Sequence, residues 1–309
     1  MKRTNNQRFS PAQLAPIVGV SESTIKRWID AGHLEGEKTP GGHRKIALPQ
    51  LLAFLRSGGR VAPSLEALGL LAERHASPAV PPDTPEALAG LLLRGDTEVA
   101  RTLVLEQFRL GRALDELLDR LVAPAMAWVG TQWVDGKIDV YQEHVATLRT
   151  WNILVELRGL LPIPPDRAPL ALGGSPEGDP YLLPTLMAEL TLADMGWRTL
   201  NTGPNTPVAS LLEAVTRHRP RLVWLSITSV KPDEGFFEGY PHFFEAAQAA
   251  GASVVIGGQG LTAALQDRLV ASGFGTRLAH LKAFARSRSS SPIPGQGQRS
   301  GLTRRGSRR

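Results

Sequence analysis

The sequence of 309 residues contains no cysteine. This absence excludes disulfide bonds, thiolate metal ligands and cysteine nucleophiles, and it is typical of a cytoplasmic protein. The chain also lacks a run of about 18 apolar residues, so no membrane-spanning helix is expected, and no signal peptide precedes Phe9. It shows no paired carboxylates, Ser-His-Asp arrangement or His-rich metal spacing of the kinds used in catalysis. We therefore expect a cytoplasmic protein that is not an enzyme.

Acidic side chains are scarce at both ends of the chain. Residues 1–60 carry ten Lys and Arg against four acids, and residues 286–309 carry seven Arg and no acid. Because the net charge of the whole chain is +6, the part between them carries −7. Cationic ends favour a polyanion such as DNA, whereas a duplex repels the acidic middle. The middle of the chain is thus expected to have a different task.

The first 60 residues show the pattern of a helix-turn-helix. Ser10 is placed to cap a helix with Pro11 at its first position, Gly19 ends that helix, and Ser21 caps a second one. Apolar residues at helical spacing give the second helix a buried stripe. Its opposite face offers four polar side chains to a major groove: Ser23, Thr24, Lys26 and Arg27.

A basic wing follows the two helices. Residues 40–42, Pro-Gly-Gly, favour a tight hairpin, and the strand behind it carries three cations suited to a phosphate backbone: His43, Arg44 and Lys45. Residues 49–55 predict a third helix that closes a small core. Residues 1–60 are thus expected to form a winged helix-turn-helix that binds double-stranded DNA. The alternative is a solvated helical hairpin with a chance basic loop.

Proline and glycine divide the rest of the chain into four parts. Residues 61–84 are rich in Gly, Pro, Ala and Ser and predict a linker. Residues 85–162 predict a four-helix bundle, with helices near 85–93, 96–107, 110–130 and 138–160. Residues 166–285 alternate apolar runs with helical patterns, which is typical of a doubly wound α/β domain with a parallel sheet. Residues 286–309 predict a disordered basic tail.

The α/β domain offers candidate ligand loops. Its predicted strands lie at residues 169–172, 198–200, 222–227 and 253–256, and its predicted helices at 183–195, 207–217, 238–250 and 262–271. Ligands bind at the carboxyl ends of such strands. Ser226 and Thr228 stand at the end of the third strand, and Gly257 and Gly258 follow the fourth. Taken alone, small residues after strands are more often ordinary turns.

Residues 9–56 resemble the winged helix-turn-helix of the MerR family, most specifically at Trp28, Gly32 and the run 40–44. A helix bundle followed by a doubly wound domain behind such a unit resembles the cobalamin-dependent, light-sensing transcriptional repressors. That family carries a Trp, nine residues and then Glu-His, and here nine residues separate Trp133 from Glu143 and His144. The resemblance implies that these three side chains line the upper face of a corrin. The alternative is a core Trp133 and a solvated helix start.

The loop after the first predicted strand departs from that family. Cobalamin-binding domains place Asp/Glu-x-His-x-x-Gly here, in which the His binds cobalt from below and the acid orients it. In this chain Asp179 matches the acid, whereas Tyr181 replaces the His and Pro184 replaces the Gly. A phenol is protonated at neutral pH and is a poor cobalt ligand. The resemblance also implies that a hydroxyl of the segment 226–229 holds the nucleotide tail of the cofactor.

The resemblance implies a DNA-binding transcriptional regulator, a repressor, whose C-terminal half senses adenosylcobalamin, changes its homo-oligomeric state and responds to light. Three interpretations stay open: cobalamin binds without a protein lower ligand, another tetrapyrrole binds, or a degenerate domain responds to a protein partner. A corrinoid carrier of methyl-transfer enzymes shares the bundle and sheet, but the missing His and the fused DNA-binding unit argue against it. A protein that binds DNA constitutively is a further alternative. No protein metal ligand is predicted.

Overall fold

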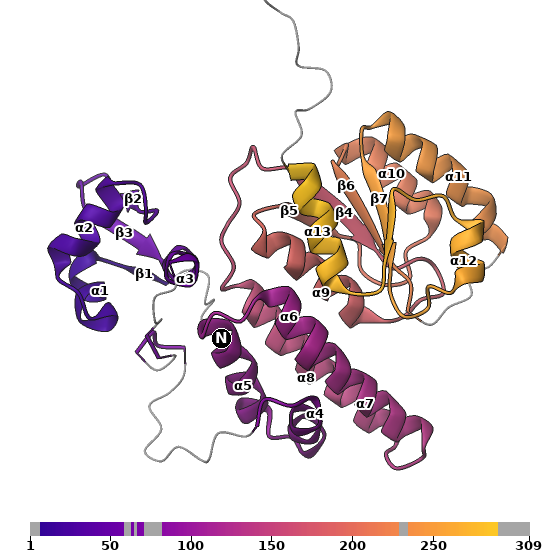
Figure 1. Ribbon diagram of the computed structural model, residues 1–309, viewed down its shortest axis with the longest axis horizontal. Coiled ribbons are helices and arrows are strands. Elements are labelled where there is room, and N and C mark those ends of the chain that lie inside the picture. The colour runs from indigo at the N-terminus through magenta and orange to yellow at the C-terminus, as the bar shows by residue number, and fades with distance from the viewer. Residues whose placement is uncertain (1–6, 59–62, 65–66, 71–81, 229–233, 290–309) are drawn as a thin grey trace, which may run out of the picture.

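The structure is a computed structural model. It describes residues 7–58, 63–64, 67–70, 82–228 and 234–289. Three parts follow one another along the chain (Figure 1): a small α+β domain, a group of helices, and an α/β domain on a parallel sheet. The fold class predicted from the sequence is confirmed. In this described part of the chain, no helix combines the length and the hydropathy needed to cross a membrane.

The N-terminal domain, residues 7–58 and called the reader below, packs three helices against an antiparallel sheet of order β1-β3-β2. Its elements are β1 (Arg8–Phe9), α1 (Pro11–Val18), α2 (Glu22–Asp30), β2 (Glu37–Lys38), β3 (Arg44–Ala47) and α3 (Leu48–Ser57). The predicted caps are present, since Ser10 Oγ accepts from Gln13 N and Ser21 Oγ accepts from Thr24 N. Gly19 ends α1 at φ 72°, where glycine has no steric cost.

The middle part contains α4 (Pro85–Arg94), α5 (Thr97–Arg109) and α8 (Val140–Arg158) where the sequence predicts helices. The helix predicted at 110–130 consists of three consecutive segments: α6 (Leu114–Leu117), the π-helical turn η2 (Leu118–Val122) and α7 (Ala123–Val134). It begins and ends later than expected. Gly111, at φ 92°, closes α5 in a left-handed conformation and is not a helical residue.

The C-terminal part is built on a five-stranded parallel sheet of order β5-β4-β6-β7-β8. Its strands are β4 (Leu170–Gly174), β5 (Arg198–Asn201), β6 (Leu222–Ser226), β7 (Ser253–Gly257) and β8 (Gly273–Gly275). Its helices are α9 (Leu182–Asp194), α10 (Val208–His218), α11 (Glu234–Ala249), α12 (Ala263–Arg268) and α13 (Leu278–Ser289). The first four strands and the helices between them are confirmed, whereas β8 and α13 were not predicted.

Helices cover both faces of this sheet (Figure 1). Trp197 and Trp224 are buried on the face covered by α9 and α13. Leu211, Phe243 and Leu265 pack from α10, α11 and α12 on the other face. A sheet buried on both faces needs strands that are continuous apolar runs, which is why the central strands are readable from sequence. The carboxyl ends of β4, β6 and β7 remain as the edge where a ligand can approach.

The structure corrects the predicted start of the tail at residue 286, because α13 continues to Ser289. The carboxylate of Asp119 accepts hydrogen bonds from the first backbone N–H groups of α13, those of Leu278 and Ala279, at 2.9 and 3.0 Å. The bundle therefore holds the helix that the sequence assigned partly to a tail. Residues 290–309 of the predicted tail, and residues 61–62, 65–66 and 71–81 of the predicted linker, lie outside the described residues.

Candidate functional site

All the residues predicted to enter a DNA groove lie on α2: Ser23, Thr24, Lys26 and Arg27. The hydroxyl groups of Ser23 and Thr24 lie 2.8 and 2.9 Å from the Oγ atom of the cap residue Ser21. Lys26 is exposed, and its Nζ atom lies 2.7 Å from Glu22 Oε1 one turn earlier. The hydroxyls therefore fix the start of α2, while the cations remain at the surface.

The wing lies beside this helix. Lys38 of β2 pairs in register with Arg44 of β3, and the exposed His43 stands in the turn between the two strands. A groove of about 350 Å³ runs between the wing and the start of α1 and α2, and Lys26, His43 and Arg44 all line it. The fold thus brings three of the predicted DNA-contacting side chains together, and Lys45 follows, half-buried, on β3.

Arg44 has a second partner, because its guanidinium pairs with Asp30 in the last turn of α2. Its side chain is three-quarters buried. This charge-assisted contact links the wing to α2. Sequence reasoning gave Arg44 only a phosphate-contacting role and missed this bracing contact.

Trp133, Glu143 and His144 lie at the tip of the helical hairpin formed by α7 and α8. Trp133 is in the last turn of α7, and the other two are near the start of α8. The Trp133 side chain is 46% exposed, so it does not belong to the core. Glu143 Oε1 accepts a hydrogen bond from Thr147 Oγ1 at 2.9 Å, and His144 Nε2 lies 3.7 Å from Glu143 Oε2. Trp133 and the pair ten and eleven residues after it thus lie at the same end of the bundle.

Further apolar side chains are exposed at the end of α7 and along the first three turns of α8. We call the whole set the hairpin-tip patch, and it comprises Trp133, Val134, Val140, Tyr141, Val145 and Leu148. Exposed apolar patches in soluble proteins mark sites for ligands or partners. A flat apolar ligand placed here would remove an indole and several aliphatic side chains from water.

Asp179 is completely buried in the loop between β4 and α9. Its Oδ1 atom accepts from Tyr181 N at 3.1 Å, and its Oδ2 atom accepts from Thr228 N at 2.6 Å. The carboxylate that the family motif assigns to orienting a histidine therefore joins two loops at the sheet edge. Tyr181 caps α9 and its side chain is 41% exposed.

Two hydroxyl groups near this edge are buried without a hydrogen-bond partner among the described residues: Ser175 Oγ and Thr228 Oγ1. Ser226, at the end of β6, is buried as well. Buried polar groups are nearly always paired, so orphan hydroxyls indicate a bound water or a polar group of a ligand. Ser175 was missed at the sequence level, where its position one residue after a strand was the only signal.

Gly257 and Gly258 lie where β7 meets the loop after β6. Ile227 N donates to Gly257 O at 2.7 Å, and Gly260 N donates to Ile227 O at 3.0 Å. A Cβ atom on Gly258 would lie 2.1 Å from Ile227 O. The immediate reason for glycine at position 258 is therefore the approach of the chain's own backbone.

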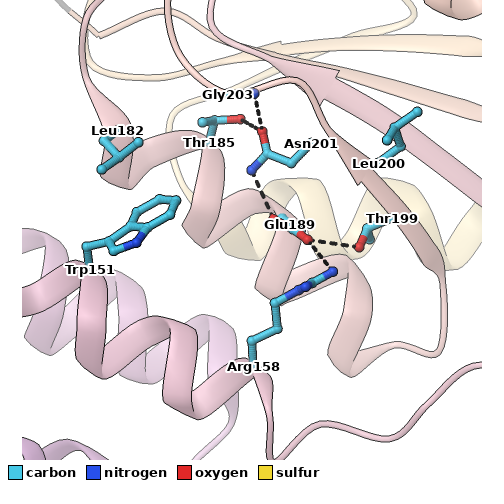
Figure 2. Close-up of a pocket in the computed structure, with 9 residues that line it drawn as sticks. All are labelled: Trp151, Arg158, Leu182, Thr185, Glu189, Thr199, Leu200, Asn201 and Gly203. Atoms are coloured by element: carbon cyan, nitrogen blue, oxygen red, sulfur yellow. Dashed lines mark hydrogen bonds and ion pairs between the residues drawn. The ribbon is translucent and has the colours of Figure 1, made fainter. Parts of the chain in front are cut away.

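A pocket of about 320 Å³ opens where α8 meets α9 and β5, and Figure 2 shows its lining. Glu189, nearly fully buried, is its centre: its carboxylate accepts from Thr199 Oγ1 at 3.2 Å and Asn201 Nδ2 at 3.0 Å, and it pairs with Arg158 Nη2 at 2.8 Å. The indole of Trp151 forms the opposite wall (Figure 2). None of these residues was predicted, because they come from three separate elements.

The side chains at these places can be compared with the parts of a corrinoid that they would have to bind. A tetrapyrrole ring exceeds the 320 Å³ pocket, so that pocket can take only a side group of one. The hairpin-tip patch and the orphan hydroxyls suit the flat face and polar periphery of a corrinoid. Below the ring the residues do not fit, because Tyr181 supplies no nitrogen and Asp179 is held by backbone N–H groups. Across the described residues, no cluster of three or more His, Cys, Asp or Glu side chains is suited to a metal.

Two protein families match separate parts of the chain. A helix-turn-helix domain matches residues 8–59, and a B12 binding domain matches residues 85–149. The first match covers the reader, and the second covers the helices that carry the hairpin-tip patch. The chain thus joins a DNA-binding helix-turn-helix domain to a B12-binding domain.

A relative of this chain is the HTH-type transcriptional repressor CarH of Myxococcus xanthus, which is 28% identical over 243 residues, or 72% of this chain and 79% of the relative. The resemblance predicted from the sequence is confirmed at this distance. The solved structure of the Methanosarcina barkeri monomethylamine corrinoid protein aligns with a TM-score of 0.53 at 16% identity, over 64% of this chain and 94% of that chain. At this identity the likeness establishes the fold alone.

Proposed function

We propose that this protein is a transcriptional repressor whose C-terminal half senses a corrinoid and changes its oligomeric state when the corrinoid binds. The observation that carries the proposal is the union, in one chain, of a reader with a cation-lined groove and a B12-binding domain with an exposed apolar patch. A relative that aligns with 72% of this chain is a repressor by its name. The proposal includes no catalytic activity.

DNA is held by the reader. Lys26 and Arg27 reach base edges from α2, and His43 and Arg44 contact phosphates from the wing. The N-terminus of α2 contributes its free backbone N–H groups, which favour a phosphate. Ser23 and Thr24 stand at that same helix start.

The corrinoid is held between the hairpin-tip patch and the carboxyl ends of β4 and β6. Trp133 covers the upper face of the ring, and Glu143 and His144 satisfy polar groups near it. Ser175, Ser226 and Thr228 bind polar groups of the cofactor's periphery and tail. With an adenosyl group bound, the corrinoid would supply a light-sensitive cobalt–carbon bond. The loop 175–181 contains no histidine that could bind the cobalt, and its buried acid already accepts from two backbone N–H groups.

One experiment tests the proposal. Full-length protein is mixed with adenosylcobalamin in darkness and desalted, and its visible spectrum and its mass by light scattering are measured before and after illumination. DNA affinity is measured in parallel on duplexes selected from a random pool. We expect a retained corrinoid band, a ligand-dependent mass and a light-dependent DNA affinity.

Trp133→Ala should reduce corrinoid retention, whereas Val270→Ala, which removes an even more exposed apolar side chain far along the chain, should not. Identical mass and DNA affinity with and without adenosylcobalamin, hydroxocobalamin and haem would contradict ligand sensing. A protein that retains corrinoid but binds no duplex would contradict the role of the reader.

A second candidate is a ligand-independent regulator controlled by a protein partner. It is favoured by one observation, the use of Asp179 to join two loops beside a tyrosine in the place of the lower ligand. A colourless protein that takes up no tetrapyrrole on reconstitution, yet binds DNA, would favour this candidate.

A further inference from the structure

Arg56, in the last turn of α3, connects the reader to both halves of the rest of the molecule. Its Nη1 atom lies 3.1 Å from Asp194 Oδ1 at the end of α9. Its guanidinium carbon lies 3.8 Å from the ring centroid of Phe108 on α5. Its Nη2 atom donates to the carbonyl oxygen of Arg112 at 3.4 Å. One side chain of the reader therefore touches the bundle and the α/β domain together.

This contact is largely shielded from solvent. The side chain of Arg56 is 14% exposed and that of Asp194 is 17% exposed. Removing one partner of a buried ion pair leaves the other charge uncompensated, so the pair strongly favours one placement of the reader. The guanidinium also stacks on the ring of Phe108, which adds a cation–π attraction to the ion pair. A small displacement of Asp194 would therefore change how Arg56 holds the reader.

Helix α9 joins Asp194 to the proposed ligand site. It begins at Leu182, directly after Tyr181, and its 13 residues end at Asp194. At 1.5 Å per residue it is a rod of roughly 20 Å. Midway along it Glu189 pairs with Arg158 of α8, and the pair lines one side of the pocket in Figure 2. Helix α9 is thus attached to the loop 175–181 at one end and to α8 in the middle.

We propose that Arg56 couples the reader to α9, so that a change at the start or middle of α9 alters how the reader is held. The identity of the trigger, a corrinoid, rests on the proposed function, whereas the coupling itself does not. Arg56 acts as a positioning residue: it contacts neither DNA-facing side chains of α2 nor the hairpin-tip patch among the contacts described above. The DNA-facing surface of the reader is on α2 and the wing, and α3 is the element nearest the rest of the molecule (Figure 1).

The test measures where the reader lies. Because the chain has no cysteine, Glu35→Cys in the reader and Arg217→Cys on α10, both exposed positions, give two unique spin-label sites. Their distance distribution in the full-length protein is recorded by double electron–electron resonance. Arg56→Met and Asp194→Asn, which remove the ion pair from opposite sides, should each widen it about twofold as alternative placements become populated. The double variant should be no wider than either single variant.

A third variant separates coupling from simple docking. Among the contacts described above, Glu189 has none with the reader. Glu189→Gln keeps the volume of its side chain and removes the charge that pairs with Arg158. We expect it to shift the distance distribution in the otherwise unchanged protein and to cause no further shift in the Arg56→Met background. Arg268→Met is the matched control, because it removes an ion pair with Glu234 on the opposite face of the sheet.

Unchanged distributions in Arg56→Met and Asp194→Asn would overturn the proposal, and so would an equal effect of Glu189→Gln with and without Arg56. If Glu189→Gln moves the reader through Arg56 but adenosylcobalamin does not, the coupling is supported and the corrinoid trigger is the part that fails.

Discussion

Asp179→Asn tests whether the acid in the loop 175–181 is a structural tie. The buried carboxylate accepts two backbone N–H groups, from Tyr181 and Thr228. An asparagine keeps one acceptor oxygen and turns an NH₂ group toward the other N–H. One charge-assisted bond, worth about 1.5–3 kcal/mol, is lost, and a buried donor is left unpaired. We therefore expect a loss of about 2–3 kcal/mol in the free energy of unfolding.

For a domain of this size, a loss of that amount lowers Tm by roughly 4–12 °C. Differential scanning calorimetry of the protein without ligand measures it. Glu177→Gln is the matched control, since that exposed carboxylate sits two residues earlier in the same loop. Equal Tm values for Asp179→Asn, Glu177→Gln and the unchanged protein would refute the assignment of Asp179 to joining the two loops.

Three further predictions concern DNA, glycine and cobalt. Arg44→Ala should weaken binding to all duplexes and reduce the slope of log K against log salt by about 0.9, and an unchanged slope would remove the wing from the DNA contact. Gly258→Ala should cost at least about 4 kcal/mol in chemical denaturation because its Cβ meets Ile227 O. Gly251→Ala, at a positive φ facing open space, should cost only about 1–2 kcal/mol, and equal losses would contradict this reading. Tyr181→His should add nitrogen coupling to the electron paramagnetic resonance spectrum of bound cob(II)inamide, and coupling already present with Tyr181 would show another nitrogen ligand.

Local signals explain what the sequence predicted well. Ser10 and Ser21 cap helices through their own hydroxyls, and Gly19 ends one through its own backbone, so each boundary depends on residues close in the chain. The central strands β4, β6 and β7 are buried on both faces, and their sequences are continuous apolar runs.

The elements that were missed have no such signal. β8 (Gly273–Gly275) holds two glycines in three residues and forms a strand because β7 offers it a free edge. α13 contains Arg286 and Arg288 near its end and has a composition close to that of the segment after it. Its start is capped by Asp119, a residue 159 positions earlier, which no local pattern contains.

The same distinction separates the parts of the candidate site. The spacing of Trp133, Glu143 and His144 is local, because a helical hairpin with a short turn brings its two ends together whatever the rest of the fold does. Glu189 with Arg158, and Arg56 with Asp194, are meetings of helices whose positions depend on how three domains pack. In the sequence, a buried acid on a helix looks the same as a solvated one, because its partner comes from another element.

The tyrosine at position 181 is where the two kinds of information must be combined. Sequence alone says that the histidine is missing, and that statement suits a degenerate domain as well as a corrinoid held by other means. The structure adds that the neighbouring acid has a different use, since Asp179 ties the loop to Thr228 while two hydroxyls beside it find no partner among the described residues. An apolar side chain in place of Asp179 would leave the N–H groups of Tyr181 and Thr228 without this acceptor, so the loop needs the acid whether or not a ligand binds. The two hydroxyls have no such structural use among the described residues, and together with an exposed indole at the hairpin tip they favour a site that receives a polar ligand at the carboxyl end of the sheet.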